Sequence, residues 1–67
     1  MEQNITILYR IKEYRENRGL TQEQLAEKSG VSRSLINQLE TGKITSTTTD
    51  TLRKLARALC CDVGDLV

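Results

Sequence analysis

The residues best suited to chemistry in this sequence form a polar set between positions 33 and 41. Its members are Arg33, Ser34, Asn37, Gln38 and Thr41. The amide and hydroxyl groups among them both donate and accept hydrogen bonds, and arginine and asparagine can pair bidentately with guanine and adenine. Serine, asparagine and threonine are poor helix formers, so helix stability does not explain their presence. The set therefore suits the edges of DNA bases, and a solvated outer face is the alternative.

A helix over 33–41 places this polar set on one face. Three apolar residues recur at helical spacing on the other face: Leu35, Ile36 and Leu39. Ser32 is a favourable N-cap residue, and Gly42 supplies the left-handed conformation that ends a helix. One face is therefore predicted to pack against a core while the other stays exposed.

A second helix is predicted immediately before it, over 22–29. Thr21 and Gln24 have the spacing of a capping box, in which two side chains satisfy free backbone amides of the first turn. Gly30 ends this helix, and only Val31 separates it from the next N-cap. Two helices joined by so short a turn predict a helix-turn-helix, the unit that sets a helix into the DNA major groove.

These motifs resemble the phage repressor and Cro-type (Cro/C1) family of helix-turn-helix regulators, the XRE family. The matching stretches are GLTQEQLAEKSGVS at 19–32, I-x-x-L-E-x-G-K at 36–43 and T-L-x-K-L-A-x-A-L at 51–59. The resemblance extends from Ile7 to Leu66. It implies a five-helix fold and a sequence-specific DNA-binding transcriptional regulator, expected to be a repressor that reads the major groove with the helix over 33–41.

The remaining segments predict three further helices, at about 5–18, 49–59 and 63–66. The first has the apolar stripe Ile7, Leu8, Ile11 and Tyr14, and the second has Leu52, Leu55, Ala56 and Leu59. Asp62 can cap the last short helix. No long stretch alternates with period two, so we expect one compact all-α, repressor-like domain over residues 1–67.

The predicted site is larger than its base-reading residues, which are Arg33, Ser34, Asn37 and Gln38; Gln38 can instead reach only the DNA backbone. Phosphate contacts are predicted for Gln22, Ser32, Thr41 and Lys43, at or near the helix ends. A role in capping alone is the alternative for Gln22. By resemblance, Arg15 and Glu40 form an ion pair that joins the first helix to the recognition helix, and two plain surface charges are the alternative.

The loop over 42–50, GKITSTTTD, is one residue longer than the commoner family form and lacks its proline. Thr47, Thr48 and Thr49 compete as the next N-cap, and the resemblance favours Thr48. In the family this loop often approaches the DNA backbone. Its hydroxyls can contact phosphate, but capping in a solvated loop is the favoured alternative.

Cys60 and Cys61 are adjacent, and the chain contains no histidine. A vicinal pair rarely forms a disulfide and one chain lacks the ligands for tetrahedral zinc, so the prediction is no metal and two small buried hydrophobes in a reducing compartment. The resemblance implies glycine or asparagine at position 60, where the helix ends in a left-handed conformation. A cysteine costs about 1 kcal/mol there, unless the helix ends in another way.

The charge balance is the weakest support for a DNA-binding protein. The chain has 67 residues, a net charge of +1 and neither Trp nor Phe, which predicts one small domain with an aliphatic core. Local positive charge can come from the helix starts at Gln22 and Arg33 and from four basic side chains: Lys43, Arg53, Lys54 and Arg57. We therefore expect weak non-specific affinity and a specificity that depends on a dimer.

The expected partner is double-stranded DNA with a palindromic operator, bound by a homodimer. Val63, Leu66 and Val67 are the candidates for the dimer interface, although Val63 and Leu66 can instead close the core of one chain. No cofactor, small-molecule ligand or membrane partner is expected. The expected location is the cytoplasm. The alternative function is a protein-interaction or antitoxin module on the same scaffold. An enzyme is not expected, because no residues assemble an acid, a base or a nucleophile.

Overall fold

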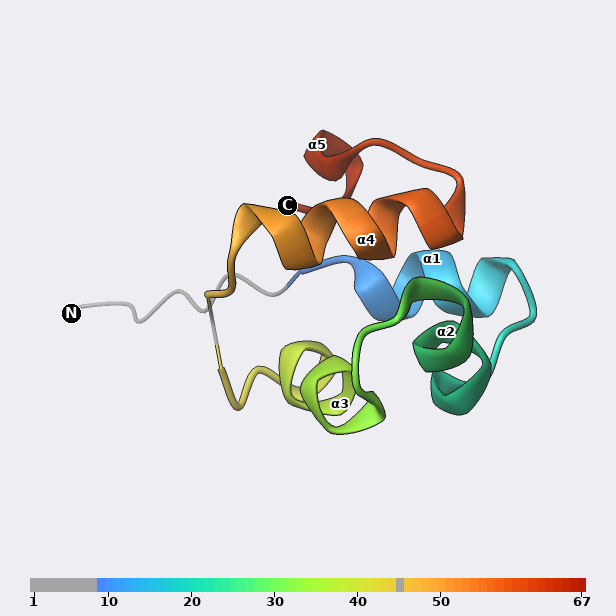
Figure 1. Ribbon diagram of the computed structural model, residues 1–67, viewed down its shortest axis with the longest axis horizontal. Helices are drawn as coiled ribbons and strands as arrows, with labels where there is room; N and C mark the ends of the chain where they lie inside the picture. Colours follow the sequence, from blue (N-terminus) through green and yellow to red (C-terminus); the bar gives the residue numbers. More distant parts are fainter. Residues whose placement is uncertain (1–8, 45) are drawn as a thin grey trace, which may run out of the picture.

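Five helices make up the part of the protein that the computed structural model describes, residues 9–44 and 46–67 (Figure 1). They are α1 Ile11–Asn17, α2 Gln22–Ser29, α3 Arg33–Thr41, α4 Thr49–Leu59 and α5 Val63–Leu66. No strand occurs in these two ranges, and the predicted all-α class is confirmed.

Helix α1 is shorter than predicted, whereas the other four helices have the predicted bounds. It begins at Ile11 instead of about residue 5, and Ile7 and Leu8 of the predicted stripe lie outside the described residues. The backbone N–H of Arg10 donates to the carbonyl of Leu66 at 2.7 Å. Because this long-range bond holds Arg10 against α5, Tyr9 and Arg10 do not continue the helix.

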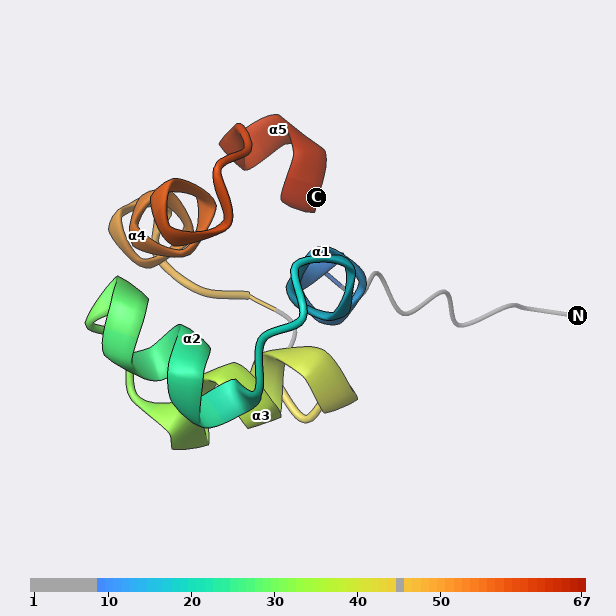
Figure 2. The ribbon, with the colours of Figure 1, turned by 90° about the vertical axis from the view of Figure 1, so that its right-hand side faces the viewer.

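The core consists of aliphatic side chains from all five helices and the turn between α2 and α3. Its buried members are Ile11, Leu25, Val31, Ile36, Leu39, Leu52, Leu55, Ala56, Leu59 and Leu66. Helix α4 lies above α2, as Figure 2 shows, and it contacts both α1 and α5. The apolar stripe of α4 therefore packs against α1, α2 and α5. No helix in the described ranges is long and apolar enough to span a membrane.

The end of α1 is attached to the end of α4. Arg18 Nε donates to the carbonyl of Leu59 at 2.5 Å, which satisfies a free carbonyl at the end of α4. The guanidinium groups of Arg10 and Arg18 lie 5.4 and 5.0 Å from the centre of the Tyr14 ring. These contacts anchor α1, from which Arg15 reaches the candidate site.

Helix α4 ends at Cys60 in the left-handed conformation, with φ 56° and ψ 46°. Cys60 is the one non-glycine residue with positive φ in the described part of the chain. The helix thus ends in the left-handed conformation that the resemblance implies, with cysteine in place of the implied glycine or asparagine. Of the two expected arrangements, the strained one is therefore present.

The predicted burial of both cysteines is wrong for Cys60, whose side chain is exposed. In a left-handed helix ending it is the following residue that packs back on the helix. Cys61 is that residue here: its N–H donates to the carbonyl of Ala56 at 3.0 Å, and its side chain packs against the core. Burial raises the pKa of the Cys61 thiol, and both thiols are free.

Candidate nucleic-acid interface

Helix α2 begins with the predicted capping box, which is confirmed. Thr21 Oγ1 accepts from the backbone N–H of Gln24 at 3.0 Å, and Gln24 Oε1 accepts from the backbone N–H of Thr21 at 2.8 Å. Gly30 ends the helix at φ 78°. Because the start of α2 is fixed in this way, the side chain of its first residue, Gln22, has a defined position beside α3.

Helix α3 follows after a turn of three residues, 30–32, and its caps are also as predicted. Ser32 Oγ accepts from the backbone N–H of Leu35 at 3.1 Å, and Gly42 ends the helix at φ 79°. The hydroxyl proton of Ser32 remains able to donate to a phosphate oxygen. The cap and the predicted phosphate contact are therefore compatible at Ser32.

The two faces of α3 separate as the spacing predicted. Ile36 and Leu39 are fully buried, and Leu35 packs partly against the same core. On the outer side, Arg33, Ser34 and Asn37 are exposed, whereas Gln38 is half-buried. Of the four predicted base-reading residues, Gln38 is thus the least accessible.

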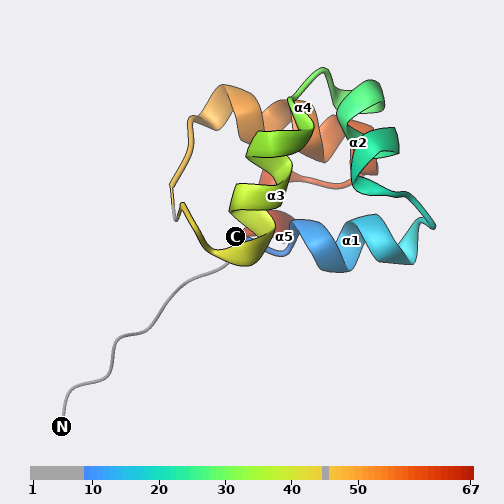
Figure 3. The same ribbon diagram turned by 90° about the horizontal axis from the view of Figure 1, so that it is seen from below.

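Three of these residues share one hollow with the start of α2. Gln22, Arg33, Ser34 and Asn37 line it, so the structure brings together three predicted base-reading residues and one predicted phosphate contact. Figure 3 shows the two helices that contribute these residues, with α3 in front and α2 beside it. Gln38, Thr41 and Lys43 do not line the hollow. All four lining side chains can donate hydrogen bonds to acceptors on DNA.

Thr41 is engaged within its own helix. Its hydroxyl donates to the carbonyl of Asn37 at 2.9 Å. A hydroxyl has one proton and phosphate oxygens only accept, so a phosphate contact from Thr41 requires this bond to open. Lys43 is exposed just after Gly42 and meets no such restriction.

Arg15 and Glu40 form a nearly buried ion pair between α1 and α3. Arg15 Nε lies 2.8 Å from Glu40 Oε2, and Arg15 Nη2 lies 3.0 Å from Glu40 Oε1. The side chains are 11% and 3% exposed, respectively. Arg15 Nη1 also donates to the carbonyl of Leu20 at 2.7 Å, so one guanidinium joins α1, the loop before α2, and α3. The hydrogen bonds that Arg15 donates to Glu40 raise the pKa of Arg15, whose guanidinium stays charged.

Sequence reasoning missed a third partner of this ion pair. Gln22 Nε2 donates to Glu40 Oε1 at 3.0 Å, and Asn37 Nδ2 lies 3.5 Å from Gln22 Oε1. Gln22 and Glu40 belong to different helices, and no local spacing in the sequence relates them. Only the crossing of α2 and α3 brings the two side chains together.

The basic residues expected on α4 do not extend this hollow. Lys54 and Arg57 line a separate one at the end of α2, together with Lys28 and Ser29. Lys54 Nζ also lies 3.5 Å from Asp50 Oδ2 on the same helix.

Helix α4 begins after the N-cap residue that the resemblance favours, Thr48. Its Oγ1 accepts from the backbone N–H of Thr51 at 3.2 Å. That loop hydroxyl thus serves as a cap.

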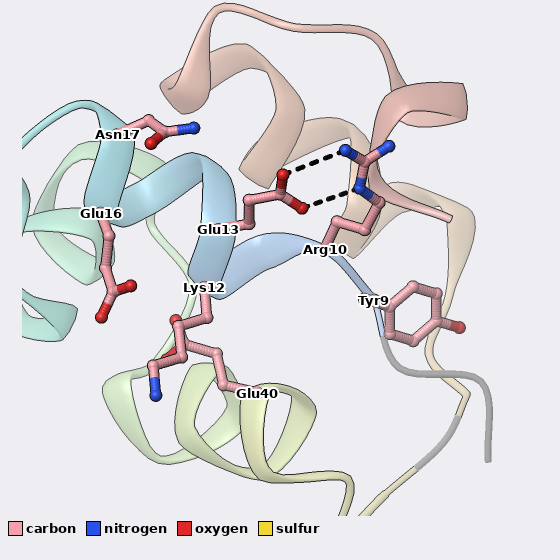
Figure 4. A pocket seen from close by; sticks show the side chains of 7 residues that line it. All are labelled: Tyr9, Arg10, Lys12, Glu13, Glu16, Asn17 and Glu40. Carbon is pink, nitrogen blue, oxygen red and sulfur yellow. Dashed lines mark hydrogen bonds and ion pairs between the residues drawn. The ribbon is translucent and has the colours of Figure 1, made fainter.

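A further hollow beside α1 carries charges of both signs. Its lining residues are Tyr9, Arg10, Lys12, Glu13, Glu16, Asn17 and Glu40 (Figure 4). Arg10 and Glu13 make two hydrogen bonds across it, at 2.9 and 3.1 Å, and these lower the pKa of Glu13. Both groups are well exposed, so the pair adds little to stability.

One predicted dimer-interface residue needs correction. Leu66 is fully buried in the core of a single chain, because α5 turns its side chain inward and Arg10 binds its carbonyl. Leu66 is therefore unavailable to a partner. Val63 is half-buried against the same core, whereas Val67 is 58% exposed.

Two capped helices joined by a three-residue turn define a helix-turn-helix unit. A helix-turn-helix family model matches residues 11–66. The chain belongs to this family of XRE-type (Cro/C1) DNA-binding transcription regulators, which the sequence motifs resemble. No curated protein matches it.

Proposed function

We propose that this protein is a sequence-specific repressor that reads the major groove of DNA with α3. The hollow lined by Gln22, Arg33, Ser34 and Asn37 is the observation that carries the proposal. Recognition helices present the side chains of their first turns to base edges, and Arg33, Ser34 and Asn37 occupy that part of α3. A cytoplasmic location is part of this proposal.

Each of these residues has a role that its chemistry suits. Arg33 pairs with the two acceptors of guanine, and Asn37 pairs with the acceptor and donor of adenine. Ser34 accepts from or donates to either kind of base edge, and Gln38 adds a contact at the rim of the interface. These contacts set the sequence preference.

Phosphate contacts set the affinity and the orientation on the duplex. Gln22 and Ser32 lie at the starts of α2 and α3, where free amides and the positive end of the helix dipole favour an anion. Lys43 adds a full charge just beyond α3. Because the net charge is only +1, a few such contacts have to supply most of the electrostatic attraction.

The test is selection of bound duplexes from a randomised pool, followed by binding measurements on the selected site at several salt concentrations. Wild-type protein is expected to enrich one sequence. Asn37→Ala should lose about 1–3 kcal/mol on that site and relax the preference at one base pair. Lys43→Ala should keep the preference and flatten the salt dependence by about one unit. Failure of the wild type to enrich any sequence would reject the proposed function.

A further inference from the structure

A continuous chain of polar contacts runs from the nearly buried ion pair to the base-reading face. Glu40 Oε1 accepts from Arg15 Nη2 and from Gln22 Nε2, each at 3.0 Å. Gln22 Oε1 then faces Asn37 Nδ2 at 3.5 Å. Asn37 is exposed at the far end of the chain, on the outer face of α3.

The direction of each contact follows from the chemistry of Glu40. A carboxylate only accepts hydrogen bonds, so Gln22 must turn its NH2 group toward Glu40 and its carbonyl oxygen away. That oxygen lies toward Asn37 and can only accept, so Asn37 must present its NH2 group to Gln22. Glu40 thereby sets the orientation of two side-chain amides, although its own side chain is only 3% exposed.

This orientation matches one base. An asparagine that recognises adenine donates from Nδ2 and accepts at Oδ1. The NH2 group of Asn37 has two protons, one for Gln22 and one for the base, while its Oδ1 remains free to accept. Reversing the amide would place an acceptor opposite the adenine acceptor and a donor opposite its donor.

We propose that Glu40 is a positioning residue for specificity, which acts through Gln22 to hold the amide of Asn37 in the orientation that pairs with adenine. The inference rests on the proposed DNA-binding function. It separates two roles of Glu40: the ion pair with Arg15 holds α1 against α3, and the contact with Gln22 selects a base.

Glu40→Gln tests this role because glutamine has both a donor and an acceptor. With either group of glutamine facing Gln22, the amide of Gln22 is free to take either orientation. Gln22→Met is the second variant, since it interrupts the chain while leaving the ion pair in place. Arg18→Ala is the control for stability alone, because Arg18 binds the end of α4 and touches none of the site residues.

The measurement is the base distribution that each variant selects from a randomised duplex pool, with thermal melts of the same proteins. Asn37→Ala identifies the base pair that Asn37 reads. At that pair, Glu40→Gln and Gln22→Met should lower the preference for adenine by about fivefold or more and leave the other positions unchanged. Arg18→Ala should melt at a lower temperature and keep the wild-type distribution.

Two results would overturn the inference. One is an unchanged preference for adenine in Gln22→Met. The other is a Glu40→Gln distribution that weakens evenly at every position, as a purely structural role of Glu40 requires. A wild-type protein that selects no sequence would reject the DNA-reading function itself, which is a separate outcome.

Discussion

At the scale of single residues, Glu40 is the point at which the candidate site is most constrained. Its side chain is 3% exposed and takes three hydrogen bonds, two from Arg15 and one from Gln22. A buried carboxylate is tolerable only when a countercharge and hydrogen bonds replace its water. In the described residues no buried side-chain polar atom lacks a partner, so this cluster is fully satisfied. Removing one member leaves buried polar atoms of the others without a hydrogen-bond partner, which lowers the stability of the fold.

The first prediction concerns the ion pair as a structural tie. Arg15→Met should lower the free energy of unfolding by about 3 kcal/mol or more, because it strands the buried carboxylate of Glu40. Glu40→Gln should cost less, since Arg15 is more exposed and keeps its bond to the carbonyl of Leu20. The double variant should cost less than the sum of the two. Denaturant unfolding of the four proteins measures this coupling, and small additive effects would mean that the pair is not a tie.

At the scale of elements, what could be predicted from the sequence depended on whether the signal was local. Helices α2 and α3 carry their own caps and glycine endings, so their bounds follow from nearby residues alone. The start of α1 depends instead on a bond between Arg10 and Leu66, which are far apart in the chain. The same holds in the site: the residue types along α3 indicated base reading, but the contact of Gln22 with Glu40 exists only once α2 and α3 cross.

The ending of α4 gives the second prediction. Cys60 has a left-handed conformation that costs about 1–2 kcal/mol for a residue with a Cβ, while glycine brings an entropy cost of about 0.5–1 kcal/mol. Cys60→Gly should therefore raise the free energy of unfolding by about 0.5–1 kcal/mol. Cys60→Ala is the matched control, because it removes the exposed thiol and keeps the Cβ. Equal stabilisation by alanine and glycine in thermal melts would show that backbone strain is not the cause.

At the scale of the whole molecule, the small size of the domain limits how much DNA one copy can read. A single recognition helix contacts only a few base pairs, and two copies about 34 Å apart on one face of the duplex are the usual solution. The core uses Leu66 to close itself, which removes this residue from any shared surface. Among the described residues, Val67 is the large hydrophobic side chain that stays exposed, so the proposed symmetric contact depends on it.

The last prediction tests this dimer on DNA. Sedimentation of the protein with a full palindromic site should give two chains per duplex, and with a half-site one chain per duplex. Val67→Asp should weaken the two-chain complex by about tenfold or more, since a symmetric contact would bury the side chain of both copies and then place two like charges together. Binding of the same variant to the half-site should match the wild type, because Val67 does not line the hollow proposed to face the bases. A one-to-one complex on the full palindrome would rule out the dimer. If Val67→Asp formed the two-chain complex as tightly as the wild type, the contact between the two chains would not involve Val67.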